Sequence, residues 1–162
     1  MRRKERRLSP EEAMGVLERG EYGVLALNAE QGFPYAVPLS YVLMNGALYF
    51  HSAMDGRKSR ALALDRRVCF TVVGAVAPVF DKDFSTYYES AMVFGRATLV
   101  RDAEEKLRSL MALAEKYLPE HMDKAEASIR HSFARTAVYR IGIELLSGKS
   151  KRPKSPAGPA PA

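Results

Sequence analysis

The dipeptide Asn45-Gly46 lies between two runs rich in β-branched and aromatic residues, residues 34–44 and 47–52. Both residues of this dipeptide tolerate positive φ, so the sequence predicts a tight β-hairpin. Four more segments have strand character: residues 23–27, 67–73, 87–100 and 139–145. In the last of them every second residue is large and apolar, from Tyr139 to Leu145. Six strands joined mostly by short turns predict a mainly β fold, an antiparallel β-barrel with peripheral helices.

Helix signals occur at two places in the chain. Ser9-Pro10-Glu11-Glu12 is typical of a capped helix start, and Gly20 is placed to end that helix. Apolar residues recur at three- and four-residue steps from Leu107 to Leu118, and Pro119 follows. Residues 121–132 could form a second, more polar helix. Gly95, inside a predicted strand, indicates a bulge or bend.

The length of 162 residues favours a single domain with a core that needs no disulfide. Cys69 is the only cysteine, and its place in an apolar strand favours a small core residue over a reactive thiol. No apolar run approaches the roughly 20 residues of a membrane span, and the charged N-terminus lacks the apolar stretch of a signal peptide. We therefore expect a cytoplasmic protein without membrane contact.

The net charge of +6 is concentrated at the two ends of the chain. Residues 1–7 carry a net +4 and the chain from Lys149 onward another +4, so the remainder is slightly acidic. No aromatic residues interleave with these cations, so we expect no nucleic-acid partner. After Gly148 the chain consists mainly of Lys, Ser, Pro, Ala and Gly, which predicts disorder. We place the folded domain at residues 1–152 and a disordered tail at 153–162.

Several kinds of chemistry find no support in the sequence. The glycines form neither a dinucleotide fingerprint nor a phosphate loop, and there is no nucleophile elbow. His51, His121 and His131 have no metal-type spacing, so no metal site is expected. His121 and His131 lie in a polar helical stretch and are expected at the surface.

A positive signal runs from residue 35 to residue 60. Pro38 removes a hydrogen-bond donor from its strand, so the strand is expected at a sheet edge or bulge, where unpaired backbone groups can face a ligand. The strand that ends at Ser52 is followed by a turn and a helix start carrying Arg57, Lys58 and Arg60. Free backbone N–H groups and cations suit a phosphate. A turn with solvated basic residues remains the alternative.

The motifs of this chain, in order, resemble those of the pyridoxamine 5′-phosphate oxidase-like split-barrel proteins that bind FMN, and in particular the branch with the 5-nitroimidazole resistance proteins. The matching segments cover roughly residues 1–152: residues 2–5, 20–25, 34–42, 49–53, 56–58, 88–91, 94–95, 143–144 and 148–149. The resemblance implies a six-stranded split barrel and a homodimer with FMN in two equivalent clefts between the subunits.

The resemblance also implies which residues contact the cofactor. One subunit would contribute a strand segment along the flavin ring and residues near the flavin or its phosphate: Val37, Pro38, Leu39, Ser40 and Tyr41, then His51, Ser52, Arg57 and Lys58. Tyr88, Glu89 and Ser90 would reach the cleft from the partner. If any side chain donates a proton, His51 is the candidate, but we favour the alternative that it only hydrogen-bonds the cofactor or packs between its neighbours.

These implications give two hypotheses for function. In the first, the protein is an oxidoreductase that passes electrons from a reduced nicotinamide cofactor through FMN to a small acceptor such as a nitroaromatic. In the second, it binds a flavin or haem without turnover, as a redox or stress protein; a deazaflavin is a further possible cofactor. Pyridoxamine phosphate oxidation itself is disfavoured, because the chain shows one well-formed basic cluster and that substrate would need another.

Overall fold

The computed structural model describes residues 3–29, 32–81 and 83–152, so the predicted tail at 153–162 lies outside the described residues. The strands are β1 (Gly23–Asn28), β2 (Pro34–Leu39), β3 (Val42–Met44), β4 (Ala47–Ala53), β5 (Arg67–Asp81), β6 (Asp83–Leu99) and β7 (Thr136–Lys151). The α-helices are α1 (Pro10–Arg19), α2 (Arg57–Leu64), α3 (Ala103–Tyr117) and α4 (Met122–Ser132). Short 3-10 turns η1 (Lys4–Arg6), η3 (Pro119–His121) and η4 (Phe133–Arg135) complete the described elements.

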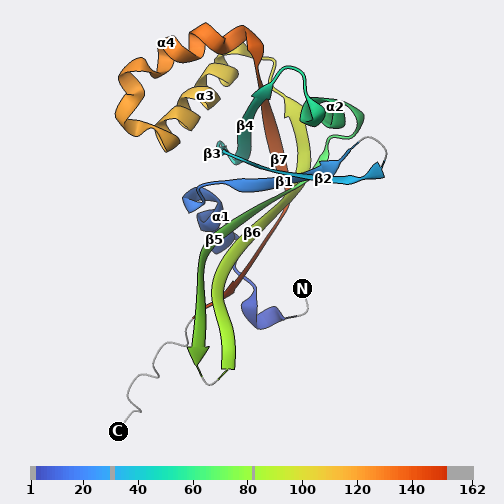
Figure 1. The fold of residues 1–162 in the computed structure, drawn as a ribbon, viewed down its shortest axis with the longest axis vertical. Coiled ribbons are helices and arrows are strands. Elements are labelled where there is room, and N and C mark those ends of the chain that lie inside the picture. Colours follow the sequence, from blue (N-terminus) through green and yellow to red (C-terminus); the bar gives the residue numbers. More distant parts are fainter. Residues whose placement is uncertain (1–2, 30–31, 82, 153–162) are drawn as a thin grey trace.

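The strands form one curled antiparallel sheet in the order β2-β1-β5-β6-β7-β4-β3. This confirms the mainly β barrel-like fold, but with seven strands rather than the expected six. The extra strand arises because residues 34–44 do not form one strand: they break at Ser40 and Tyr41 into β2 and β3. Helices α3 and α4 cover one end of the sheet, and the long β5–β6 hairpin extends away from the other (Figure 1).

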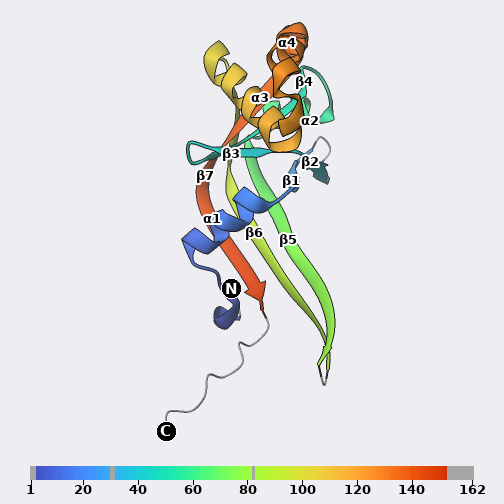
Figure 2. The same ribbon diagram turned by 90° about the vertical axis from the view of Figure 1, so that its left-hand side faces the viewer.

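Local sequence signals account for the turns and helix starts. Asn45 and Gly46 adopt φ values of 51° and 69°, as the predicted hairpin between β3 and β4 requires. The Ser9 hydroxyl accepts the Glu12 N–H, and the Glu12 carboxylate accepts the Ser9 N–H, which confirms the capping box of α1. Helix α1 then lies across β5, β6 and β7 (Figure 2).

At Gly95 the backbone of β6 lies tightly against that of β7. The pairing of the two strands shifts between Phe94 and Gly95, which confirms the predicted irregularity. A Cβ on Gly95 would lie 1.9 Å from the carbonyl oxygen of Gly142, so only glycine fits without movement of the backbone.

Two apolar clusters stabilise the fold. The larger fills the inside of the curled sheet and is centred on fully buried side chains such as Leu25, Phe50 and Phe70. The smaller lies between β4 and the α3–α4 pair and contains Tyr49, Leu110 and Val138. The first part of β4, residues 47–50, is therefore buried with protein on both faces, and residues 51–53 continue from it toward solvent.

The structure corrects two expectations about the chain. Disorder directly after Gly148, as the composition there indicated, was wrong for residues 149–151, which lie inside the domain placed at 1–152: they continue β7, because β6 extends far enough to pair with them. Cys69 was expected in the core, but it is only half-buried, because its side chain lies on the outward side of β5 between inward-facing Val68 and Phe70.

Candidate functional site

The two ends of the sheet leave unpaired strand edges. Among the described residues, strand β2 pairs with β1 and with no other strand, so Pro38 lies in an edge strand, as its missing N–H predicted. Strand β3 pairs with β4 only at residues 47–49, so the remainder of β4, residues 50–53, has no partner on that side among the described residues. Backbone groups on both edges are therefore free to bind a ligand.

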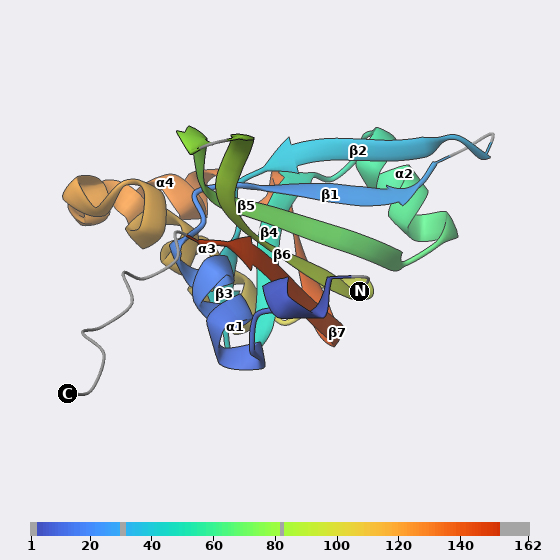
Figure 3. The ribbon, with the colours of Figure 1, turned by 90° about the horizontal axis from the view of Figure 1, so that it is seen from below.

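Helix α2 brings these two edges into one site. The Arg57 guanidinium lies 4.6 Å from the centre of the Tyr35 ring on β2. The Lys58 ammonium lies 5.3 Å from the centre of the Phe50 ring on β4. The first turn of α2 thus contacts both edge strands, and Figure 3 shows α2 beside β1 and β2. The resemblance placed these same three segments around one cofactor.

The start of α2 has the features of an anion site. Its N-cap residue, Gly56, has no side chain to accept the N–H groups of the first turn. Arg60 forms an ion pair with Asp55. In contrast, Arg57 and Lys58 have no carboxylate partner among the described residues. Partial burial lowers the pKa of Lys58, because burial disfavours the charged ammonium.

The two β4 residues expected at the site lie on opposite faces of that strand. Ser52 shares the face of Phe50, toward the inside of the sheet, and His51 shares the face of Tyr49, toward the helices. His51 is an exposed residue, although neighbouring groups crowd its imidazole. Partial burial, and to a lesser extent the charge of Lys58, lower its pKa, so its imidazole is neutral at neutral pH.

The residues of β2 also alternate between the inner and the outward side of the sheet. Val37 and Leu39 are half-buried and pack on the inner core, whereas Pro38 and Ser40 are exposed on the outward side. Tyr41 is fully buried. Its hydroxyl donates to the carbonyl of Leu17, and its own N–H and C=O contact the Tyr117 hydroxyl, so it has no polar group left for a ligand. Its role within the chain is to hold the break between β2 and β3.

Tyr88, Glu89 and Ser90 lie far from this site within one chain. Ser90 pairs with Lys149 on β7, whereas His51 pairs with Val138. Those two β7 residues are eleven positions apart, a path of about 36 Å at roughly 3.3 Å per residue. Around Glu89 there is instead a second, open pocket of about 540 Å³, in which Glu89 forms an ion pair of 3.2 Å with Arg19 of α1.

The outward side of the sheet exposes several large apolar side chains, a feature that the sequence analysis missed. Strand register aligns two rows across five strands: Pro38, Val24, Thr71, Met92 and Ser147, and Ala36, Ala26, Cys69, Phe94 and Leu145. We call this surface the outer face. Phe94 is 41% exposed and Leu145 58% exposed. The alternation of β6, in which Met92 and Phe94 point away from the core, is the signal that could have revealed it.

Other expectations can be checked directly. His121 and His131 are exposed, as predicted. In the part of the chain that the structure describes, no cluster of His, Cys, Asp or Glu is suited to a metal ion. No helix in the same residues is long and apolar enough to cross a bilayer.

Comparisons with solved structures find close matches to the fold. A proposed 5-nitroimidazole antibiotic resistance protein from Bacteroides thetaiotaomicron superposes with a TM-score of 0.77 at 23% identity, over 89% of this chain and 86% of that one. An FAD-binding protein from Mesorhizobium loti is 30% identical over 91% of this chain and 98% of that one, with a TM-score of 0.65. An FAD- and haem-binding protein from Mycobacterium smegmatis superposes with a TM-score of 0.75 at 24% identity, over 89% of this chain and 72% of that one.

Sequence comparison points to the same group of proteins. No curated protein matches the chain. The family model of pyridoxamine 5′-phosphate oxidase, however, matches residues 9–150, which is most of the chain. The match begins at the cap of α1 and ends in β7, so it includes every strand of the sheet. The chain therefore belongs to the pyridoxamine 5′-phosphate oxidase family.

Proposed function

We propose that this protein is a flavoprotein that binds FMN between two copies of the chain and uses it to transfer electrons to a small acceptor. The observation that carries the proposal is the start of α2, where Arg57 and Lys58 have no carboxylate partner among the described residues and lie beside a helix N-terminus without a side-chain cap. A phosphate would neutralise both cations and accept the free N–H groups. The solved relatives described as binding FAD support a flavin as the carrier of that phosphate.

The residues around α2 suit the different parts of FMN. Lys58, Arg57 and the Ser52 hydroxyl would hold the phosphate. The edge of β2 from Val37 to Ser40 would lie along the ring, because an edge strand offers unpaired N–H and C=O groups to a planar heterocycle. His51 lies at the free edge of β4, where the charge of Lys58 contributes to lowering the pKa of the imidazole. The neutral imidazole of His51 would hydrogen-bond the cofactor.

The outer face supports a homodimer. A mostly apolar exposed surface over five strands is unfavourable in water and is typical of an interface between chains. A second copy placed there would bring its own Tyr88, Glu89 and Ser90 to the cleft that one chain leaves open. Those residues are too far along the sheet to serve the site of their own subunit. We expect the dimer to bury well over about 1,200 Å².

A bound flavin accepts and donates a hydride equivalent, so the chain itself needs to supply position, charge and shelter from water. Arg57 and Lys58 would fix the phosphate end, and the β2 edge would orient the ring. His51 would supply a proton only when protonated, which its lowered pKa makes less frequent at neutral pH. This arrangement fits an oxidoreductase that uses a reduced nicotinamide cofactor and an acceptor such as a nitroaromatic.

An absorption spectrum of the purified protein is the first test. Absorption bands at about 375 and 450 nm are expected from the flavin itself. A Soret band instead would indicate haem, and a protein that takes up neither FMN nor FAD would contradict the proposal. Oxidation of NADH or NADPH by the flavin-loaded protein, measured with and without a nitroaromatic, then separates an enzyme from a binding protein.

A further inference from the structure

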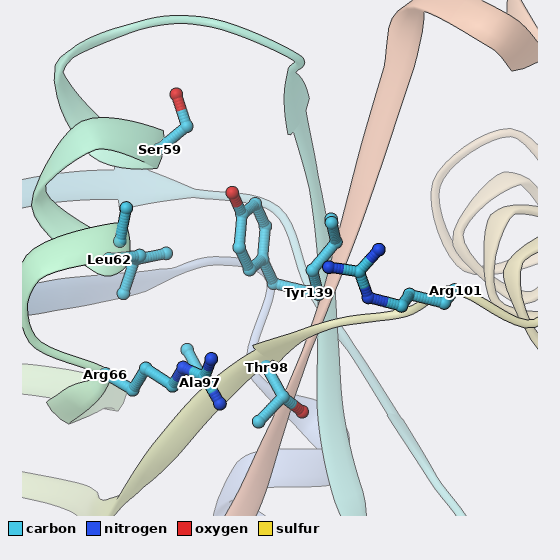
Figure 4. Close-up of a pocket in the computed structure, with 9 residues that line it drawn as sticks. Ser59, Leu62, Arg66, Ala97, Thr98, Arg101 and Tyr139 are labelled. Carbon is cyan, nitrogen blue, oxygen red and sulfur yellow. The ribbon is translucent and has the colours of Figure 1, made fainter.

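Another pocket, separate from the one around Glu89, lies along the flank of α2. Its volume is about 210 Å³, and it is bounded by α2, the last residues of β6 and the start of β7. Figure 4 shows Arg66 and Arg101 approaching Tyr139 from opposite sides, with the Tyr139 hydroxyl directed toward Ser59. Arg57 and Lys58 lie at the start of α2, which is about 12 Å long. The pocket runs along the helix and continues beyond the helix C-terminus to Arg66.

The pocket carries two positive charges and no negative one. Both acidic neighbours of the arginines in sequence are engaged elsewhere. Asp65, next to Arg66, binds Arg67 at 2.8 Å and Asn28 at 2.9 Å. Asp102, next to Arg101, accepts the N–H of Glu105 as the cap of α3. Within the described residues, neither Arg66 nor Arg101 has a carboxylate partner, so two like charges share one cavity.

The third polar group of the pocket is the hydroxyl of Tyr139, whose ring is packed against the core. Tyr139 is 8% exposed and stacks on Phe50, with the ring centres 5.4 Å apart. Burial raises its pKa, so the hydroxyl is protonated and can donate. The hydroxyls of Ser59 and Thr98 already lie against backbone carbonyls, those of Gly56 and Arg140. The Tyr139 hydroxyl has no such partner among the described residues and is free for a ligand.

We propose that this pocket binds a phosphate group other than the flavin phosphate at the start of α2, through Arg66, Arg101 and the Tyr139 hydroxyl. Two guanidinium groups present several N–H donors in fixed directions, which suits a tetrahedral oxyanion with several acceptor oxygens. The phosphate has two sources with the same chemistry. It belongs either to the adenylyl half of FAD, which extends beyond an FMN-type phosphate, or to a separate phosphate ester.

The test is the binding of AMP, followed by calorimetry, with adenosine as the probe that lacks the phosphate. Because AMP contains no flavin, the pocket is tested whether or not the flavin proposal holds. We expect AMP to bind the purified protein and adenosine to bind at least about tenfold more weakly. Arg66→Gln and Arg101→Gln should each weaken AMP by about tenfold or more, and Tyr139→Phe by less. Arg108→Gln is the matched control, because Arg108 is an exposed arginine paired with Glu104 of α3.

Comparison of FMN-loaded with FAD-loaded protein identifies the source of the phosphate. If AMP binds the FMN-loaded form and not the FAD-loaded form, the pocket holds the adenylyl half of FAD. If AMP binds both forms equally, the pocket takes a separate phosphate ester. The proposal is overturned if AMP and adenosine bind alike, if AMP does not bind at millimolar concentration, or if Arg66→Gln and Arg101→Gln leave its affinity unchanged.

Discussion

The hydroxyl of Tyr117 lies 2.9 Å from both the amide nitrogen and the carbonyl oxygen of Tyr41, so one side chain of α3 satisfies the backbone where β2 ends and β3 begins. The same hydroxyl lies 2.6 Å from the carbonyl of Glu21. The neighbouring Lys116 donates to the carbonyl of Gly20 and lies over the Tyr41 ring. The end of α3 therefore holds two loops that lead into the strands of the candidate site.

Removing the Tyr117 hydroxyl should destabilise the fold. Tyr117→Phe leaves the Tyr41 N–H without its partner, and we expect a loss of about 1–3 kcal/mol in the free energy of unfolding. Urea unfolding measures this loss. Tyr22→Phe is the matched control, because Tyr22 is 58% exposed, and it should be neutral. Equal stabilities of the two variants would mean that water replaces the Tyr117 contact.

Lys58→Ala should weaken FMN binding by roughly 10- to 150-fold, the range expected when one charge-assisted hydrogen bond to the phosphate is lost. Riboflavin lacks the phosphate, so its affinity should hardly change. Fluorescence titration measures both ligands, and Lys124→Ala, at an exposed lysine of α4, is the control. A parallel loss for FMN and riboflavin would show that Lys58 does not bind the phosphate.

Phe94→Glu should convert the dimer to monomers, because it places a charge in the middle of the outer face. Sedimentation equilibrium at micromolar concentration measures the change. Leu118→Glu, at a position that is 52% exposed at the end of α3, is expected to leave the dimer intact. If the wild-type protein sediments as a flavin-loaded monomer, the proposed assembly is wrong.

Gly95→Ala should cost at least about 1–3 kcal/mol, because its Cβ would meet the Gly142 carbonyl and push two paired strands apart. Gly142→Ala is the control from the opposite strand. Its Cβ would meet only the Arg140 guanidinium, at 3.7 Å, and should be tolerated. Thermal unfolding of both variants provides the comparison, and a stable Gly95→Ala protein would show that β7 can move aside.

Stability should also fall in alkali because of Tyr41. Burial, and secondarily Tyr117, raise its pKa well above the value of 10.0 that applies in the unfolded chain. Below pH 10 the hydroxyl is protonated in both states, so it adds no pH dependence. Above pH 10 only the unfolded chain ionises there, and stability declines as pH rises. Tyr41→Phe should lower stability near neutral pH and reduce this decline, as measured by urea unfolding from pH 9 to 11.

Much of the fold was accessible from the sequence because the signals were local. Asn45-Gly46 forces a particular hairpin, and Ser9 with Glu12 forces a particular helix start. The bend at Tyr41 was not accessible, because its cause is Tyr117, 76 residues away. The continuation of β5 beyond Val73 was missed for a similar reason. Pro78 argues against a strand, but β1 ends its pairing at Val72, and from there β5 has one free side that tolerates proline.

In the candidate site, too, local features could be predicted from the sequence, whereas contacts between distant residues could not. The cations at the start of α2 could be predicted from a strand, turn and helix in succession, and the structure places them beside β2 and β4. That His51 and Ser52 face opposite ways follows from strand alternation, which the motif alone does not convey. The pocket between Arg66 and Arg101 joins residues 35 positions apart, and no local pattern links them.

The free side of β2 also bears on how this protein behaves when it is concentrated. An exposed edge strand can act as a template on which other molecules add their own strands, the route to fibrous aggregates. Pro34 and Pro38 each lack the N–H that such addition would use, and they occupy two of the six positions of the strand. Pro34 and Pro38 therefore make this edge a poor template for uncontrolled growth of the sheet.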